Sequence, residues 1–437
     1  MRSFCAEQYL TAVGATETVL MKGKVTKIIG LVIEADGPSI NLGELCYIYP
    51  RTDAPLLPAE VVGFRENRVL LMPLGEMQGI GPGSEVVSSR NLLRVKVGQN
   101  LLGRILDGLG NPIDGKGPII GECEYAIQNA PPAALSRRRI CEPVSVGIRA
   151  IDGLMTLGKG QRMAILAGSG VGKSTMMGMI ARNTSADVNV IALIGERGRE
   201  VLDFIERDLG EEGLKKSVVI VSTSDQPALL RIKGANTATA VAEYFRDLGL
   251  DVMLMMDSLT RVAMAQREVG LTIGEPPATR GYPPSVFAMM PKLLERSGTG
   301  EKGSITGLYA VLVDGDDMNE PIADNVRSIV DGHVVLSRRL ATLNHYPPID
   351  ILASLSRVMN EVVDAEHLKA AQRLRGLQAT YQEAEDLINI GAYAAGSNPE
   401  IDRAIERNQG IRDFLRQGVM ERVSFADTVT RLKKVVG

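Results

Sequence analysis

Tryptophan is absent from the 437 residues of the sequence, and aromatic residues together make up only 4% of it. Proteins that hold single-stranded nucleic acid usually stack its bases on aromatic side chains and carry an excess of positive charge. Here 49 lysine and arginine residues are balanced by 52 aspartate and glutamate residues, which leaves a formal net charge of −3. We therefore expect a protein without a nucleic-acid partner.

Cysteine, histidine and long apolar runs are also scarce. The 4 cysteines include no CxxC pair, and the 3 histidines offer no spacing typical of a zinc site. No segment approaches the ~20 uninterrupted apolar residues that span a bilayer. The first residues, MRSFCAEQYL, lack the apolar centre of a signal peptide. From these absences we expect a cytoplasmic protein without a disulfide framework.

Three regions of different composition follow one another along the chain. Up to about residue 95, short β-branched and apolar runs alternate with turn residues, which is typical of a small β-barrel. The turn-rich stretch Leu101–Pro118 then marks a boundary. Between about Arg138 and Leu355, apolar runs alternate with helical stretches, which predicts an α/β domain with a parallel sheet covered on both faces. Beyond Val358 the composition favours helices, above all over Glu361–Ile388.

The strongest motif is AGSGVGKST, which follows an apolar run and precedes a predicted helix. It matches the phosphate-loop pattern G-x-x-x-x-G-K-[ST], except that Ala167 replaces the first glycine. The remaining glycines let backbone N–H groups converge on phosphates, and the helix N-terminus adds partial positive charge. We expect Lys173 to reach the β- and γ-phosphates of ATP and Ser174 to complete a Mg²⁺ shell. The predicted nucleotide-binding residues are Gly168, Ser169, Gly170, Val171, Gly172, Lys173, Ser174 and Thr175.

Carboxylates follow two later strands of the predicted sheet. Asp257 ends the apolar run VMLMMD and is expected to support Mg²⁺ through water. Glu196, in GERGRE, follows the strand after the loop helix, and ligand sites of open α/β sheets lie at such strand ends. Glu196 is therefore the candidate for orienting an attacking water. Taken alone, the two segments are also typical of a buried strand and a solvated charged turn, and the phosphate loop before them favours the catalytic interpretation.

Arginines supply further positive charge for phosphoryl transfer. Arg197 and Arg261 follow the two carboxylates, and Arg357 lies far downstream in SLSR. A single surface arginine is usually an ion pair worth ~0–1 kcal/mol, and composition alone favours that interpretation. The position of Arg357, just before the helical region, is more compatible with a neighbouring subunit's site than with its own phosphate loop.

These motifs resemble the hexameric ATPases related to the catalytic subunit of rotary ATP synthases, and more narrowly the flagellar and type III secretion ATPases. The resemblance implies a β-barrel over 1–95 for oligomerisation and regulator docking, a RecA-like P-loop core over 96–360, and a C-terminal helical domain over 361–437 for substrates and chaperones. The amino-acid sequence around GSGVGKST and GERGREV is most similar to the flagellar branch. The most specific stretches are Ala167–Thr175, Asn189–Gly210, Leu229–Leu271, Gly274–Gly298 and Val313–Arg357.

The resemblance also implies individual roles. Glu196 would polarise the attacking water. Arg197 and Arg261 would stabilise the position of Glu196 and the phosphate environment. Arg357 would be an arginine finger contributed to the next subunit's site. Tyr346, in HYPPID, would stack on adenine.

Partners follow from the same resemblance. A homohexamer would surround a central stalk protein, with ATP and Mg²⁺ bound between protomers. A negative regulator or stator protein, an export gate, and export substrates with their chaperones would meet it at the cytoplasmic face of the inner membrane. Phe414 would close the adenine pocket, and Met1–Lys22 is a candidate docking segment for the regulator.

Four alternatives remain open at this point. The injectisome branch shares most of the quoted strings. A rotary ATP synthase catalytic subunit is disfavoured by GERGRE in place of GERTRE and by the lack of an acidic run near Tyr381–Ile390. A ring translocase of RNA is disfavoured by the charge balance and the absence of tryptophan. A protein that only binds nucleotide would need neither Glu196 nor Arg357.

Overall fold

The computed structural model describes residues 21–313, 315 and 317–437. The candidate docking segment Met1–Lys22 therefore lies outside the described residues, apart from its last two. The chain divides into two compact units, one formed by residues up to Leu93 with Leu271–Glu275 and one formed by the rest. Among the helices of the described residues, none is long and apolar enough to cross a membrane.

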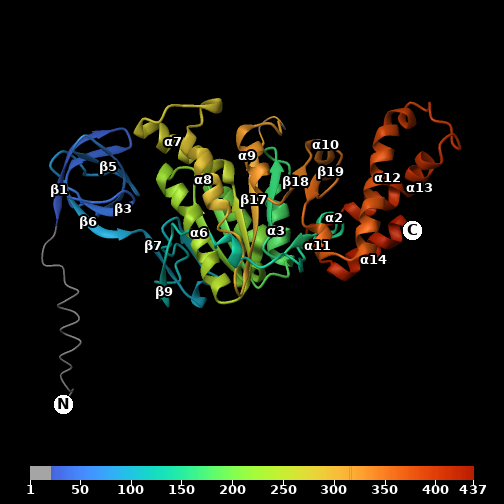
Figure 1. The fold of residues 1–437 in the computed structure, drawn as a ribbon, viewed down its shortest axis with the longest axis horizontal. Helices are drawn as coiled ribbons and strands as arrows, with labels where there is room; N and C mark the ends of the chain where they lie inside the picture. The colour runs from blue at the N-terminus through green and yellow to red at the C-terminus, as the bar shows by residue number, and fades with distance from the viewer. Residues whose placement is uncertain (1–20, 314, 316) are drawn as a thin grey trace, which may run out of the picture. The chain divides into compact units, whose positions relative to one another are not determined.

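The first unit contains a closed β-barrel (Figure 1). Its strands are β1 (Lys22–Ile29), β2 (Val32–Asp36), β3 (Glu44–Tyr49), β4 (Leu57–Arg65), β5 (Arg68–Pro73) and β6 (Glu85–Leu92). Neighbours pair antiparallel in the order β1-β2-β5-β4-β3-β6, and β6 returns to β1. Inward side chains such as Ile33, Ile48, Val61 and Leu71 fill the interior. The predicted N-terminal barrel is confirmed.

A mostly parallel sheet forms the centre of the second unit. Its strands are β8 (Ile105–Asp107), β12 (Arg162–Ala167), β13 (Val188–Ile194), β14 (Ser217–Ser222), β15 (Asp251–Asp257), β16 (Gly298–Thr299), β17 (Ser304–Leu312), β18 (Gly332–Leu336) and β19 (Ile349–Ser356). Their order is β19-β18-β12-β17-β15-β13-β14-β8, with β16 beside β17. Only the β18–β19 and β16–β17 pairs of this described sheet are antiparallel. The predicted α/β core is confirmed.

One strand of this sheet comes from the stretch that looked like a mere boundary. β8 lies inside Leu101–Pro118 and pairs parallel with β14 at the edge of the sheet. Its central residue, Leu106, is fully buried. The strand was not predicted because turn residues surround it. Asp107, its last residue, also forms the following turn by accepting hydrogen bonds from the N–H groups of Leu109 (2.9 Å) and Asn111 (2.8 Å).

Helices cover both faces of the sheet (Figure 1). α6 packs against β13, β14 and β15, and Gly234 allows it to approach closely, since a Cβ there would lie 2.9 Å from Ile194 Cδ1. The helices of this core are α2 (Arg149–Leu154), α3 (Lys173–Asn183), α4 (Gly198–Asp203), η3 (Phe204–Leu209), α5 (Gly210–Lys215), α6 (Ala228–Asp247), α7 (Leu259–Ile273), α8 (Pro284–Leu294), α9 (Pro321–Ile329) and α10 (Arg338–Thr342). Short connecting elements are β7 (Arg94–Val97), η1 (Gln99–Leu101), β9 (Cys123–Ala126), η2 (Ala134–Ser136), β10 (Pro143–Val144), β11 (Leu157–Gly158) and η4 (Thr279–Gly281).

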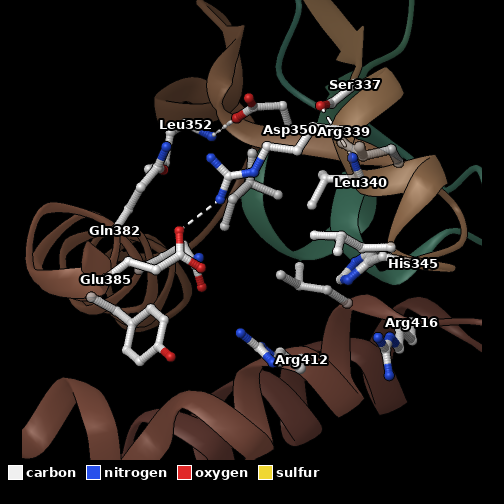
Figure 2. Close-up of a pocket in the computed structure, with 16 residues that line it drawn as sticks. Ser337, Arg339, Leu340, His345, Asp350, Leu352, Gln382, Glu385, Arg412 and Arg416 are labelled. Carbon is white, nitrogen blue, oxygen red and sulfur yellow. Dashed lines mark hydrogen bonds and ion pairs between the residues drawn. The ribbon is translucent and has the colours of Figure 1, made fainter. Parts of the chain in front are cut away.

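The C-terminal region is helical, as predicted. Its helices are α11 (Met359–Val362), α12 (Ala365–Asn389), α13 (Pro399–Leu415) and α14 (Phe425–Val436). Each long helix begins at a capping side chain: Asp364, Asn398 and Ser424 accept hydrogen bonds from the N–H groups of the first turn. α12 and α13 pack against each other, and a cavity opens between them and the α10–β19 segment (Figure 2).

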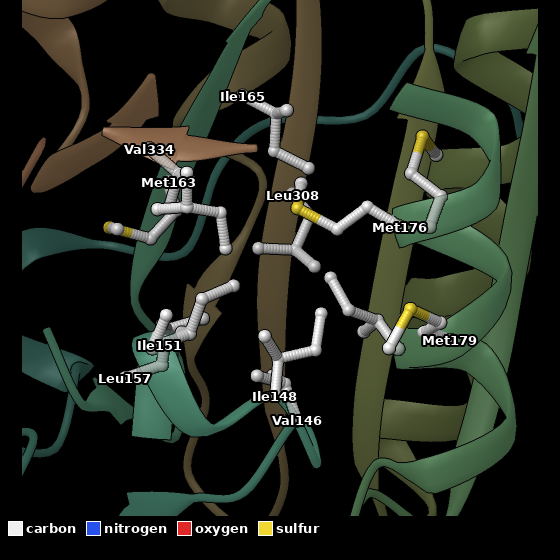
Figure 3. Packing of buried hydrophobic residues seen from close by; sticks show 14 of the residues in the cluster. Val146, Ile148, Ile151, Leu157, Met163, Ile165, Met176, Met179, Leu308 and Val334 are labelled. Atoms are coloured by element: carbon white, nitrogen blue, oxygen red, sulfur yellow. The ribbon is translucent and has the colours of Figure 1, made fainter. Parts of the chain in front are cut away.

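A hydrophobic core lies beneath the phosphate-loop helix. Met176 and Met179 of α3 extend toward Ile165 of β12 and Leu308 of β17 (Figure 3). These side chains are at most 2% exposed, and burying each one contributes about 1.5–3 kcal/mol. The same cluster reaches Phe414 and other residues of the C-terminal helices. The packing therefore joins α3 and the sheet to the helical region in one continuous core.

Candidate functional site

The phosphate loop connects the end of β12 to the start of α3. Gly170 (φ 75°) and Gly172 (φ 101°) adopt the left-handed backbone conformation that favours glycine. Ala167, which departs from the motif, is the last residue of β12 and pairs with Leu312 and Leu336. Its strand position accommodates a Cβ, so the replacement leaves the loop geometry intact.

The N-terminus of α3 lacks a side-chain cap. Among the described residues, no side-chain hydrogen bond caps the helix at Gly172, so its first N–H groups need another partner. Ser169, Gly170 and Ser174 are exposed, whereas Val171 is 2% exposed and holds the loop on the core. This helix N-terminus is therefore suited to phosphate.

Lys173, Asp257 and Glu196 converge beside the loop. The Lys173 Nζ contacts Asp257 Oδ1 and lies 3.5 Å from Glu196 Oε1. β13 and β15 are neighbours in the sheet, with Leu193 opposite Asp257, so their carboxyl ends bring the two carboxylates together. The side chains are 10%, 3% and 15% exposed for Lys173, Asp257 and Glu196. The predicted cation and both predicted carboxylates therefore form one cluster largely shielded from water.

Glu196 has an unusual protonation equilibrium. Burial is the largest cause, and the negative charge of Asp257 adds to it, so that the pKa of Glu196 rises to about 7 against the opposing effect of Lys173. A carboxyl group with such a pKa exchanges protons near neutral pH, which suits a group that orients or deprotonates water.

Arg261 lies beside this cluster, on α7. Its side chain packs over Gly195, where a Cβ would lie 2.8 Å from Arg261 Cβ. Gly195 has φ 72°, so both its conformation and this contact require glycine. The buried Nε of Arg261 has no hydrogen-bond partner within the described chain. An anionic ligand at the loop is a suitable partner for this donor.

Two other predicted arginines are not part of the cluster formed by Lys173, Asp257 and Glu196. Arg197 is 81% exposed and pairs with Glu200 at 3.3 Å. Arg357 is exposed just after β19. Its N–H donates to Asp331 O, and the Asp331 N–H donates to Arg162 O, both at 2.9 Å. These bonds place Arg357 at the start of β12, roughly 17 Å from the phosphate loop at its other end.

Tyr346 lies next to the phosphate loop. A Cβ built on Gly172 would be 3.9 Å from Tyr346 Cε1, and the tyrosine is 45% exposed. Phe414, the implied partner of Tyr346, is 4% exposed and packs against Gly153 in the core. The exposed side chain of Tyr346 is therefore accessible beside the phosphate loop.

Gln417 supports Tyr346 and was not predicted. It is 5% exposed, and its N–H donates to Tyr346 O at 2.9 Å. Its Oε1 accepts from Arg149 N–H at 2.9 Å, and its Nε2 donates to Gly147 O at 2.8 Å. No pattern identifies a lone glutamine after a helix, because its partners lie about 70 and 270 residues away in sequence.

The residues around the loop fit a magnesium ion. The hydroxyl of Ser174 and the carboxylate of Asp257 are hard oxygen donors, which Mg²⁺ prefers. Ser258 Oγ is buried beside Asp257 and lacks a hydrogen-bond partner among the described residues. In the same described residues, no group of three or more His, Cys, Asp or Glu side chains could enclose a metal. The donor set matches an ion held partly by substrate phosphates.

Three family models match the chain. The ATP synthase alpha/beta family nucleotide-binding domain matches residues 147–356. The beta-barrel domain of the same family matches residues 25–90, and the T3SS EscN ATPase C-terminal domain matches residues 363–434. The matches follow the barrel, the core and the C-terminal helices in order.

Individual relatives match almost from end to end. The flagellum-specific ATP synthase of Bacillus subtilis is 54% identical over 432 residues, which cover 99% of each chain. The type 3 secretion system ATPase of Xanthomonas euvesicatoria is 52% identical and covers 94% of this chain and 93% of its own. Among solved structures, the assembled ATPase EscN with its central stalk EscO, from enteropathogenic E. coli, superposes with a TM-score of 0.88 at 47% identity, over 95% of this chain and 100% of that one.

Proposed function

This chain belongs to the family of flagellum-specific ATP synthases and type 3 secretion system ATPases, and we propose that it hydrolyses MgATP to drive protein export by a flagellar apparatus. One observation carries the catalytic part: Lys173, Asp257 and Glu196 converge at the open N-terminus of α3. A nucleotide-binding protein without hydrolysis would not need the buried Glu196.

The residues divide the chemistry among them. The free N–H groups of the loop and the Lys173 ammonium bind the β- and γ-phosphates. Glu196 accepts a hydrogen bond from water and orients its oxygen toward the γ-phosphorus. As the bond between this oxygen and the γ-phosphorus forms, Glu196 takes a proton from the water, the bond from the γ-phosphorus to the bridging oxygen breaks, and ADP leaves. Arg261 donates its free Nε–H to this anionic region. Bound Mg²⁺ would neutralise phosphate charge, held through Ser174 and Asp257.

The position of Arg357 is an argument for a site shared between protomers. It lies at the sheet edge opposite its own phosphate loop, so it cannot reach the γ-phosphate bound by its own chain. A ring, in which Arg357 faces the loop of the next protomer, would bring the two together. The relative from E. coli is an assembled ATPase with a central stalk, and we extend a ring and a stalk partner to this chain. Tyr346 would stack on the adenine.

The branch and the remaining partners are part of the same proposal. Relatives named for flagella and for type 3 secretion have similar identities, 54% and 52%. We assign this chain to flagellar export because the amino-acid sequence around its phosphate loop is most similar to the flagellar branch. A regulator, export substrates with chaperones, and an export gate at the cytoplasmic face of the inner membrane complete the proposal.

Activity and branch need separate experiments. Purified chain should release phosphate from ATP only with Mg²⁺, and Lys173→Ala should remove this release, since it deletes the phosphate-binding cation. Equal release by the variant would contradict the assigned site. For the branch, the tagged chain would be isolated from its native cells. Recovery of flagellar export components supports the proposal, whereas recovery of injectisome components contradicts it.

A further inference from the structure

A cavity of about 310 Å³ lies between the α10–β19 segment and the helices α12 and α13 (Figure 2). Ligand pockets of proteins begin at about this size. Neither the phosphate-loop residues nor Tyr346 line it, although His345 and Arg416 of its wall directly precede Tyr346 and Gln417.

Three nitrogen-bearing side chains line this cavity. Arg412 of α13 and His345 extend into it from opposite walls, and Arg416 lies beside them (Figure 2). Arg412 lies over the ring of Tyr381, with its Cζ 5.8 Å from the ring centroid. The guanidinium groups of Arg412 and Arg416 form no ion pair or hydrogen bond in the described part of the chain. His345 is 7% exposed, and burial followed by the charges of Arg416 and Arg412 lowers its pKa.

The carboxylates of the cavity are already engaged. Glu385 pairs with Arg339 at 2.7 Å. Asp350 accepts hydrogen bonds from the backbone N–H groups of Leu352 and Ala353, both at 3.0 Å. Neither carboxylate neutralises Arg412 or Arg416, so the two guanidinium groups remain available to an incoming anion.

The rest of the cavity wall is formed by apolar side chains and by one buried amide group. Leu340, Ile351 and Leu415 contribute apolar surface. Gln378 Oε1 is buried without a hydrogen-bond partner among the described residues. A buried acceptor left unpaired costs about 1–3 kcal/mol, and a ligand that donates one hydrogen bond would remove this cost.

We infer that this cavity binds a small organic anion, with its phosphate or carboxylate head on Arg412 and Arg416 and its apolar body against Leu340 and Leu415. A guanidinium group can bind either head with two parallel hydrogen bonds. The inference does not depend on the proposed export function, since it rests on a separate set of residues.

Calorimetric titration of the full chain with two probes tests this site. Phenyl phosphate and benzoate carry the two possible heads on the same aromatic body, and benzyl alcohol is the uncharged control. Titrations are run with saturating MgADP, which blocks the phosphate loop. We expect at least one anion to bind once per chain, and the stronger of the two identifies the head. Benzyl alcohol should not bind measurably.

Variants connect binding to the cavity. Arg412→Met and Arg416→Met should each weaken the better probe by about tenfold or more, because each removes a charged hydrogen-bond donor. Arg403→Met, on the exposed part of α13, is the matched control and should bind like the parent. A circular dichroism spectrum and a urea midpoint close to those of the parent show that the variants are folded. Absence of binding by both anions in the presence of MgADP would overturn the inference, and so would equal affinity in all variants.

Discussion

Lys173 is the residue at which one ammonium group faces two carboxylates. Its Nζ contacts Asp257 and lies 3.5 Å from Glu196. The cluster therefore has one negative charge in excess when both carboxylates are ionised, in a place with little water to screen it. The raised pKa of Glu196, about 7, follows from this shared environment and not from Glu196 alone.

Replacing Glu196 separates binding from hydrolysis. Glu196→Gln keeps the shape of the side chain but removes the charge that, in the proposed mechanism, orients water. We expect nucleotide affinity close to that of the parent and a turnover lower by roughly 10²–10⁴-fold, measured by fluorescent-nucleotide titration and phosphate release. Glu206→Gln, at an exposed position of η3, serves as the control. A Glu196→Gln protein with near-parent turnover would rule out this role.

The pH dependence of hydrolysis should report the same group. The free protein's kcat/KM reflects the ionisation of its essential base, and in the proposed mechanism this base is deprotonated Glu196. Because its pKa is raised to about 7, the deprotonated fraction grows as pH increases through that value. We expect kcat/KM to rise between pH 6 and 8 and to fall toward acid. A profile that stays flat down to pH 5 would assign the chemistry to another residue.

Single residues differ in how far the sequence predicts them. Lys173 and Ser174 belong to a contiguous motif, so the local sequence is enough to identify them. Asp257 and Glu196 could be placed because parallel strands end at one edge of a sheet. The contact of Gly195 with Arg261 could not, since it depends on how α7 packs over the strand end.

At the scale of elements, the segment after α13 connects the nucleotide site to the C-terminal helices. Arg149, 3% exposed, donates to Phe414 O at 2.8 Å and also contacts Arg416 O and Glu421. Gln417 binds the backbone of Arg149 and Tyr346. The buried polar network therefore fixes the position of Tyr346 from the side of the helical region.

Removing the Gln417 side chain should loosen this connection. Gln417→Ala leaves the buried Arg149 N–H and Gly147 O without their partners, at a cost of about 1–3 kcal/mol each. We expect a lower urea midpoint and weaker ATP binding than in the parent. Gln409→Ala removes an exposed hydrogen bond to Asp413 and should change neither. If both variants behaved alike, Gln417 would have no special part in the network.

Elements with local signals were predictable, and those defined by partners were not. Asn398 followed by Pro399 marks the start of α13, since one caps the helix and the other suits its first turn. β8 has only three residues and owes its existence to pairing with β14. The cavity beside α12 and α13 likewise requires side chains from distant segments, so no sequence window contains it.

At the scale of the whole molecule, the sheet separates Arg357 from the phosphate loop of the same chain. The phosphate loop follows the carboxyl end of β12, whereas Arg357 is bound through Asp331 to the beginning of that strand. The separation of roughly 17 Å means that Arg357 cannot complete the proposed site within a single chain. The account therefore requires an oligomer in which Arg357 of one protomer meets the loop of another.

Mixing two inactive variants tests this requirement most directly. Arg357→Ala retains the phosphate loop, and Lys173→Ala retains the arginine, so a mixed ring contains some sites with both groups. An arginine acting in trans contributes about 10³–10⁵-fold to turnover. The control mixes Arg357→Ala with the double variant, in which no complete site can form. The account predicts that the first mixture regains ATP hydrolysis well above either variant alone while the control does not. No recovery in oligomers shown to contain both variants would contradict it.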